Sequence, residues 1–382
     1  MKLVIFGLSV SSSWGNGHAT LWRGLIAALG RSGHEVVFFE RDVPYYARHR
    51  DLTELPGGRL VLYPAWCDVV AAARRELDGC DVAIVTSYCA DGAAASALVL
   101  DAPLPLRVFY DLDTPITLGR LARGERVDYL PDGGLGDFDL VLSYTGGRAL
   151  DELADLLGAR RVAPLYGSVD PAVHGGALVD ERFGADLSYL GTYAADRQAA
   201  VEELLLLPAR RSPQLRFLVG GPMYPASVAW PPNVRLVEHV PPPAHPAFYG
   251  SSRLTLSLTR APMAALGFCP SGRLFEAAAR GVPVLSDWWD GLDAFFTPGE
   301  EILIARSSDD VLAALSRSPE ELALIGCAAR ERVLDEHTAR RRAAELVAIL
   351  EGGIAHVGDH SRRRSREPYP AAGVLEGAVA GR

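Results

Sequence analysis

The chain has 382 residues, of which 49% are hydrophobic and 22% are charged, so it can bury the cores of two or three ordinary domains and is not a disordered chain. Its formal net charge of −9 disfavours a nucleic-acid partner, because such proteins usually present a basic face. Its five cysteines include no Cys-x-x-Cys pair, which argues against a disulfide framework or a structural zinc site and fits a reducing compartment.

The first half of the chain alternates short apolar runs with helical patterns, which is typical of parallel α/β sheets. The first run is too short for a signal sequence, and no later run approaches the length of a membrane span. We therefore expect a cytoplasmic protein without an integral membrane segment. The predicted strands are residues 3–6, 36–39, 60–63, 82–86, 107–110 and 140–143.

The second half begins its own alternation after a stretch poor in regular structure near residues 166–184, where we place the linker. We predict an N-terminal Rossmann-like domain over 1–168, a C-terminal Rossmann-like domain over 169–352 and a disordered tail over 353–382. The predicted strands of the second half are 187–190, 216–219, 235–237, 254–257 and 284–286. Its predicted helices are 197–207, 271–280, 308–315, 319–336 and 339–350.

Two such sheets leave a cleft outside the carboxyl ends of their strands, where parallel sheets bind ligands. The clearest motif on the predicted rim of that cleft is Cys-Pro-Ser-Gly-Arg-Leu-Phe-Glu at 269–276. Pro270 and Ser271 open a helix, and the small Gly272 lets a ligand approach the backbone. The unpaired N–H groups at such a helix start suit a diphosphate.

The same motif places two charged side chains on the helix. Arg273 lies in the first turn, where it can neutralise a diphosphate leaving group. Glu276 lies one turn in, where its carboxylate can accept two ribose hydroxyls. The simpler alternative is an exposed ion pair between Glu276 and Arg280 at i,i+4 spacing.

The segment 269–286, with its continuation to Leu303, resembles the nucleotide-binding signature of GT-B glycosyltransferases related to family 4, and looks most like the spore-maturation-protein CgeB-like subgroup. The resemblance implies an α/β fold of GT-B type, with two Rossmann-like domains facing across a cleft, and a UDP- or dTDP-linked sugar as donor. It further implies retention, no metal or other cofactor, and a ribose held by Glu276. Family 4 usually carries a second glutamate where this chain has Phe268, so that contact to the donor sugar does not carry over.

The resemblance also points to donor-side residues in three other segments. Glycines there allow close backbone approach, the arginine can neutralise the diphosphate, and the histidine marks the place of the base. The simpler alternatives are a solvated helix residue, a generic turn and an exposed histidine. These residues are Gly191, Thr192 and Arg197, then Gly220 and Gly221, then His239.

On the acceptor side, a glycine-rich loop follows the first strand. Gly15 and Gly17 look like part of a dinucleotide fingerprint, but the third glycine of that motif would fall on Thr20. A nicotinamide enzyme is therefore disfavoured. In the GT-B interpretation, Gly15, Asn16 and Gly17 bring acceptor and donor phosphate together, and His18 points into the cleft.

Two carboxylates, Asp111 and Asp113, stand at the end of another predicted strand, next to Thr114. They can orient acceptor hydroxyls or act as a base, with Asp113 preferred, or they can simply cap a turn. Thr145 and Gly146 follow a later strand and also resemble the CgeB-like group. We assign these residues to the acceptor side.

The expected reaction is transfer of a sugar to a small-molecule or glycan acceptor. Retention is preferred, but His18 with Asp111 or Asp113 would form a dyad suited to inversion. A sugar-nucleotide epimerase on the same fold and a non-catalytic nucleotide-sugar-binding protein are the alternatives. The acceptor, the oligomeric state and the exact donor are not determined by the sequence.

Overall fold

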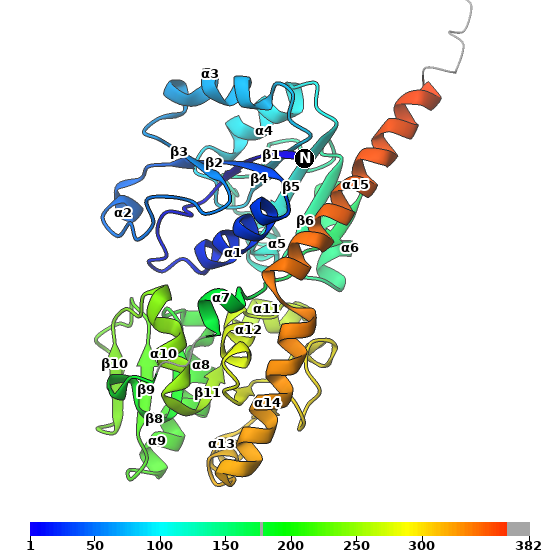
Figure 1. Ribbon diagram of the computed structural model, residues 1–382. Helices are drawn as coiled ribbons and strands as arrows, with labels where there is room; N and C mark the ends of the chain where they lie inside the picture. The colour runs from blue at the N-terminus through cyan, green and yellow to red at the C-terminus, as the bar shows by residue number, and fades with distance from the viewer. Residues whose placement is uncertain (176–178, 365–382) are drawn as a thin grey trace, which may run out of the picture.

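The computed structural model describes residues 1–175 and 179–364, which form two parallel α/β units, one above the other in Figure 1. In this part of the chain the strand order is β3-β2-β1-β4-β5-β6-β7 in the first sheet and β10-β9-β8-β11-β12-β13 in the second. The strand pairs of both sheets are parallel.

The first sheet is covered by helices on both faces. Strand β1 shows why: Leu3 and Ile5 belong to one apolar core and Val4 and Phe6 to the other, so every side chain of this run is buried. The strands are β1 Lys2–Gly7, β2 Glu35–Arg41, β3 Arg59–Tyr63, β4 Val82–Thr86, β5 Leu106–Asp111, β6 Leu140–Ser143 and β7 Val162–Pro164. The helices are α1 Gly17–Arg31, α2 Pro44–Ala47, α3 Trp66–Leu77, α4 Gly92–Asp101, α5 Thr114–Ala122 and α6 Arg148–Leu157.

The second sheet repeats this plan with its own two cores. Its strands are β8 Ala185–Leu190, β9 Phe217–Gly220, β10 Val234–Val237, β11 Ser252–Ser257, β12 Val284–Ser286 and β13 Leu303–Ile304. Its α-helices are α7 Pro171–His174, α8 Gln198–Val201, α9 Leu207–Arg211, α10 His245–Gly250, α11 Ala261–Leu266, α12 Gly272–Ala279, α13 Ser308–Leu315 and α14 Pro319–Glu336.

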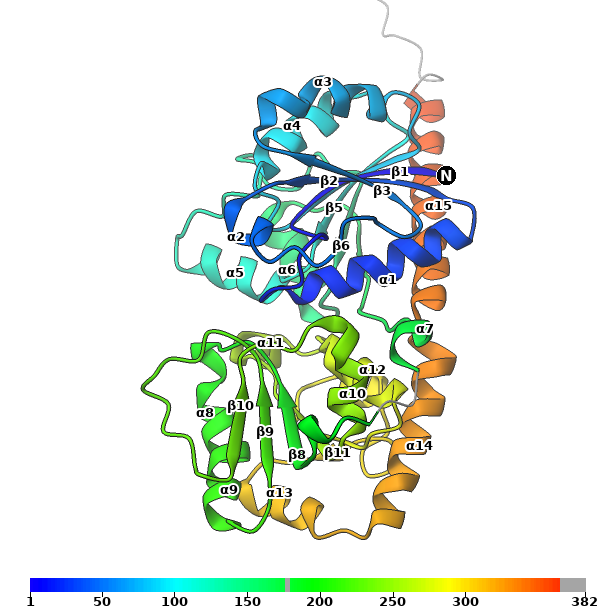
Figure 2. The same cartoon turned by 60° about the vertical axis from the view of Figure 1, so that its left-hand side comes forward.

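The last helix, α15 Ala339–Arg364, returns to the first unit, as both ribbon views show (Figures 1 and 2). Ala343, Leu346 and Leu350 are buried in the same core as the inner face of α1. The chain therefore crosses between the units twice, once before α7 and once between α14 and α15.

Each predicted strand overlaps an observed one, because buried parallel strands are short continuous apolar runs. Two short edge strands, β7 and β13, were not expected. Two predicted boundaries need correction. Residues 339–352 pack on the first unit rather than the second, and α15 continues through the start of the expected tail because Ile354 and Val357 also pack on the first core. The rest of that tail, 365–382, lies outside the described residues.

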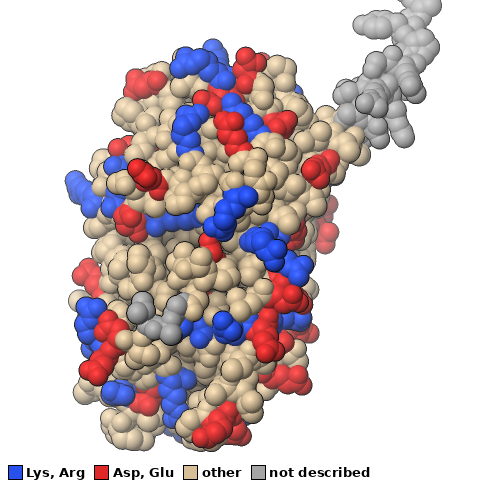
Figure 3. Space-filling model, viewed as in Figure 1, with Lys and Arg blue, Asp and Glu red and all other residues tan. Residues whose placement is uncertain are grey.

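Basic and acidic side chains are interspersed over the face seen in Figure 3, without a continuous basic patch on that face. Among the helices that the structure describes, none combines the length and apolarity that crossing a bilayer requires.

Candidate functional site

A cavity of about 360 Å³ lies between the two units. It is bounded by loops that follow the carboxyl ends of strands in both sheets, as expected for parallel sheets facing each other. The lining residues predicted from the sequence are Gly15, Asn16, Gly17, His18, Asp113, Gly191, Thr192, Arg197, Gly220, Gly221, His239, Pro270, Ser271, Gly272, Arg273 and Glu276.

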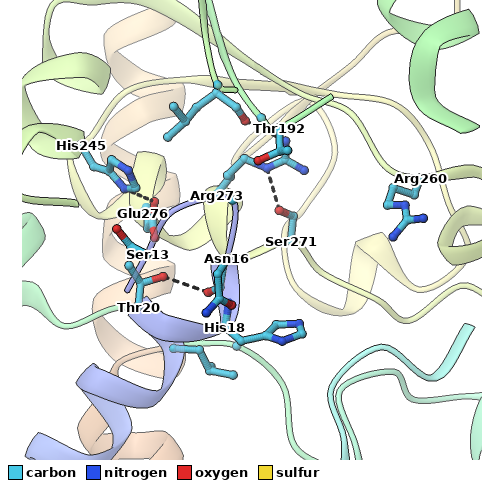
Figure 4. Close-up of a pocket in the computed structure, with 18 of the residues that line it drawn as sticks. Ser13, Asn16, His18, Thr20, Thr192, His245, Arg260, Ser271, Arg273 and Glu276 are labelled. Carbon is cyan, nitrogen blue, oxygen red and sulfur yellow. Dashed lines mark hydrogen bonds and ion pairs between the residues drawn. The ribbon is translucent and has the colours of Figure 1, made fainter. Parts of the chain in front are cut away.

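The start of α12 opens into this cavity. Ser271 is the N-cap, but its hydroxyl does not cap the helix; it accepts a hydrogen bond of 2.9 Å from Nε of Arg273 (Figure 4). A Cβ added to Gly272 would meet nothing within 4 Å. The helix start therefore keeps backbone N–H groups available beside open space, which suits an anionic ligand.

Two arginines lie beside this helix start, the buried Arg197 and the half-buried Arg273. Arg273 donates to the carbonyls of Leu190 at 2.7 Å and Leu258 at 3.2 Å, and Arg197 donates to the carbonyl of Thr192. The guanidinium carbons of both arginines lie 5.8 Å from the ring centre of Tyr189. Burial, together with the like charge of Arg273, lowers the pKa of Arg197. Neither arginine forms an ion pair with a carboxylate of the described chain.

The glycines of the donor side allow close packing at the carboxyl ends of β8 and β9. The Gly191 N–H donates to the Gly220 carbonyl at 2.7 Å. A Cβ at Gly191 would lie 2.7 Å from Nη1 of Arg273, and one at Gly221, where φ is +148°, would lie 2.1 Å from the Gly191 carbonyl oxygen. A larger residue at either position would displace backbone or the Arg273 guanidinium.

Glu276 lies at the base of the cavity and is only 7% exposed. Its Oε2 is 3.1 Å from Nδ1 of His245 and accepts from the Tyr249 hydroxyl at 3.4 Å. Burial opposes its charge, but His245, His174 and Arg273 outweigh that effect and lower the pKa of Glu276 to about 2. The alternative of an exposed pair with Arg280 is wrong, because Arg280 instead donates to the Pro246 carbonyl.

The acceptor-side loop begins α1. Asn16 is its N-cap: Oδ1 accepts from the His18 N–H at 3.1 Å, while Nδ2 donates to the Ser9 carbonyl at 2.7 Å. Asn16 therefore shapes the loop, and His18 points toward the cavity (Figure 4). Burial lowers the pKa of His18 even though the charge of Asp113 opposes this. The His18 and Tyr88 rings are 6.0 Å apart.

The two aspartates have different environments. Asp113 reaches the cavity, where its Oδ2 accepts from the Tyr88 hydroxyl at 2.8 Å and lies 3.7 Å from Nη1 of Arg260. Asp111 does not reach the cavity: it is fully buried, and Oδ1 accepts from the Asp113 N–H at 3.0 Å. Burial raises the pKa of Asp111 to about 6. Thr114 is also outside the cavity and pairs with Ser143 at 2.7 Å.

Thr145 and Gly146 brace the two units together instead of lining the cavity. The Thr145 hydroxyl donates to Sγ of Cys269 at 3.2 Å, and the Gly146 N–H donates to the Phe268 carbonyl at 3.0 Å. Phe268 itself is wedged between units, since a Cβ at Gly147 would lie 2.6 Å from its ring. A loop after a strand can serve an interdomain contact as well as a ligand, and sequence alone does not separate the two.

The residues that were not singled out from the sequence include His245 and Arg260, which line the cavity, and Tyr88, which reaches the site through its hydrogen bond to Asp113. Tyr88 and Arg260 follow β4 and β11 at the carboxyl edge, so the topological rule that found Asp113 also applies to them. Arg260 is held by Asp196, with Nη2 2.8 Å from Oδ2. His245 lies inside a short helical segment and has no local signal.

Residues 197–348 match a protein-family model described as glycosyl transferase-like. A comparison with curated protein sequences gives no significant match. Among solved structures, sucrose-phosphate synthase from Thermosynechococcus elongatus is similar over 93% of this chain and 100% of its own, with 14% identity and a TM-score of 0.67.

Two further solved structures share the fold. Anabaena HepE in complex with UDP and glucose matches 92% of this chain and 100% of its own, with 14% identity and a TM-score of 0.64. An alpha-glucosyltransferase in complex with UDP-glucose and DNA containing an abasic site matches 92% and 99%, with 13% identity and a TM-score of 0.68. The predicted GT-B fold is confirmed. Fold and family match together support a glycosyltransferase.

Proposed function

We propose that the protein transfers a sugar from a UDP- or dTDP-linked donor to a small-molecule or glycan acceptor in the cytoplasm, with retention and without a metal. The observation that carries this proposal is the pair of cations beside the start of α12. Arg197 is buried and Arg273 is half-buried in the cavity wall, and neither has an acidic partner in the described chain. Buried charges are costly unless paired, so the cavity calls for an anion of high charge.

A nucleoside diphosphate matches this wall part by part. Its phosphates would lie against the N–H groups at the start of α12 and the two guanidiniums. The ribose would lie over Glu276, whose low pKa keeps it an acceptor at physiological pH. The base would lie toward His239 and Val240, which line the same cavity. Two structurally similar proteins were solved in complex with UDP or UDP-glucose, which supports a uridine donor.

Catalysis would consist mainly of stabilising the departing diphosphate. The bond between the sugar C1 and the diphosphate oxygen breaks, the bond to the acceptor oxygen forms, and the acceptor proton leaves. Arg197, Arg273 and the α12 N–H groups stabilise the charge that develops on the diphosphate. This donor set requires no metal to supply positive charge.

Retention is supported by the arrangement of the candidate bases. The Asp113 carboxylate is engaged by Tyr88 and Arg260, and Nδ1 of His18 has no hydrogen-bond partner among the described residues. This arrangement does not favour the dyad suited to inversion. In a retaining reaction the leaving diphosphate oxygen can take the acceptor proton, and Asp113 is placed to orient sugar or acceptor hydroxyls.

A nucleic-acid acceptor is disfavoured by the net charge of −9 and by the interspersed charges in Figure 3, although one structural neighbour was solved with DNA. The subgroup related to family 4 and resembling CgeB remains our proposal for the finer family.

The testing experiment is a thermal-shift screen with UDP-, GDP- and dTDP-sugars, followed by NMR of any product. We expect a UDP- or dTDP-sugar to raise the melting temperature, since a ligand that binds only the folded state stabilises it. Release of nucleoside diphosphate with an α-linked product from an α-linked donor supports the proposal. A new nucleotide sugar without such release favours the epimerase, tight binding without turnover favours the non-catalytic protein, and an inverted product contradicts retention.

A further inference from the structure

The side chain of Tyr189 supports both arginines of the donor wall. Tyr189 lies on β8 and is fully buried in one of the two cores of the second unit. The guanidinium carbons of Arg197 and Arg273 each lie 5.8 Å from the centre of its ring. One aromatic ring therefore interacts with two cations that come from different segments of the chain, the turn before α8 and the first turn of α12.

The attraction between this ring and the arginines brings no counter-charge to the wall. A guanidinium is attracted to the face of an aromatic ring at distances up to about 6 Å. A carboxylate in the same place would attract the arginines more strongly, but it would also cancel the charge that a phosphate group needs. The other groups that hold the two guanidiniums are also uncharged, because they are the backbone carbonyls of Thr192, Leu190 and Leu258.

The two arginines need this support because their charges oppose each other. Burial lowers the pKa of Arg197, and the like charge of Arg273 lowers it further. Neither arginine has a carboxylate partner within the described residues. Without the ring of Tyr189, the backbone carbonyls alone would hold the two guanidiniums against their mutual repulsion.

The hydroxyl of Tyr189 is in a different situation from the ring. Its oxygen has no hydrogen-bond partner in the part of the chain that the structure describes. A Cβ added to Gly191 would lie 2.7 Å from this oxygen and 2.7 Å from Nη1 of Arg273, so the missing side chain at 191 lets both groups approach. The ring and the hydroxyl can therefore be tested separately, because removing the hydroxyl breaks no hydrogen bond.

We propose that Tyr189 is a positioning residue for the donor diphosphate: its ring restrains the guanidiniums of Arg197 and Arg273, so that both are in place to bind one pyrophosphate. Tyr189 is not among the described residues that line the cavity, so it acts through the arginines and not on the ligand. The inference rests on the proposed function, because it takes the ligand of these arginines to be a nucleoside diphosphate.

The experiment measures the affinity for UDP by calorimetry. Tyr189→Leu removes the ring, and we expect about tenfold weaker binding because two cation–π contacts are lost. Tyr189→Phe keeps the ring and removes only the unpartnered hydroxyl, so its UDP affinity should return to within about twofold of that of the unmodified protein. Phe217→Leu is the matched control. It removes an aromatic ring from the same core at the start of β9, and it should destabilise the fold without changing UDP affinity.

A double variant distinguishes positioning from a general loss of structure. If Tyr189 acts through Arg197, then Tyr189→Leu should weaken UDP binding by a smaller factor in the Arg197→Gln background than in the unmodified protein. A structural defect alone would lower the affinity by the same factor in both backgrounds. If Tyr189→Leu does not fold, Tyr189→Met replaces it with the same expectation, because its unbranched chain fills the core without an aromatic face.

The outcomes separate the inference from the proposed function. If the unmodified protein does not bind UDP, the proposed donor fails and the inference fails with it. The inference alone is overturned if the protein binds UDP but Tyr189→Leu keeps full affinity, or if Tyr189→Phe loses as much affinity as Tyr189→Leu. It is also overturned if the effects of Tyr189→Leu and Arg197→Gln are additive.

Discussion

The two walls of the cavity differ in how their polar side chains are used. On the donor wall, the predicted residues all line the cavity, and their charges have few internal partners: Arg197 and Arg273 donate to backbone carbonyls rather than to carboxylates. On the acceptor wall, Asp111, Thr114, Thr145 and Gly146 are committed to contacts within the protein. Two arginines without acidic partners suit an anionic ligand, whereas groups that are paired within the protein mainly stabilise it.

Backbone strain is found on both walls. Among the described residues other than glycine, Tyr88, Met223 and Phe268 have positive φ angles, of 62°, 72° and 46°. Tyr88 holds Asp113, Met223 follows the cavity residue Pro222, and Phe268 precedes the cavity residue Cys269. Such conformations cost about 1–3 kcal/mol each and tend to gather at functional sites. The cleft is therefore the place where this fold departs from low-energy local geometry.

The largest effect is expected from Arg197→Gln on the donor wall. A charged hydrogen bond to phosphate contributes about 1.5–3 kcal/mol, so UDP should bind roughly 10- to 100-fold more weakly. Uridine, which carries no phosphate, should bind both proteins equally. Arg280→Gln, at the far end of α12 from the cavity, is the matched control and should leave UDP binding unchanged. Equal UDP affinity in Arg197→Gln and the unmodified protein would contradict the assignment of Arg197 to the diphosphate, and with it the proposed difference between the two walls.

A smaller effect is expected from Asp111→Asn, and on stability rather than on binding. The folded pKa of about 6 exceeds the ordinary value of 3.8, so the fold favours the protonated acid. Its contribution is complete below about pH 4 and is lost as pH rises through 6. Asparagine mimics the protonated acid, and the variant should therefore be more stable than the unmodified protein by about 3 kcal/mol at pH 8 and about equal at pH 4.

Denaturant unfolding at the two pH values measures this difference. Turnover of the variant should stay within about twofold of the unmodified protein, because Asp111 does not reach the cavity. A folded Asp111→Asn protein without activity would show that Asp111 takes part in catalysis. It would contradict the placement of Asp111 in the protein core outside the cavity.

The smallest effect is expected from Thr145→Val, which removes the hydroxyl that donates to the Cys269 sulfur. Sulfur is a weak acceptor, so we expect a loss below about 1 kcal/mol in unfolding free energy and no change in UDP affinity. Gly146→Ala is the contrasting change, because its Cβ would lie 2.0 Å from the Tyr166 hydroxyl, so the Tyr166 side chain would have to move. Loss of acceptor turnover in a stable Thr145→Val protein would show that this loop serves the substrate after all.

The sequence by itself determined the fold class, the position of most strands and the donor-side motif. These features rest on short-range properties: continuous apolar runs form buried strands, and Pro270, Ser271 and Gly272 start a helix wherever it lies. The topological rule then placed strand-end residues such as Asp113 at the cleft without further information.

Only the tertiary structure decided which strand-end residues face the cavity and which face protein. Asp111 and Asp113 are two residues apart yet lie in a core and a cavity, because the chain turns between β5 and α5. Thr145 meets Cys269, and Glu276 meets His245 and His174, across long sequence separations. The local sequence likewise does not predict that α15 packs on the first unit. Its apolar stripe indicates that it packs on something, and only the path of the whole chain selects the partner.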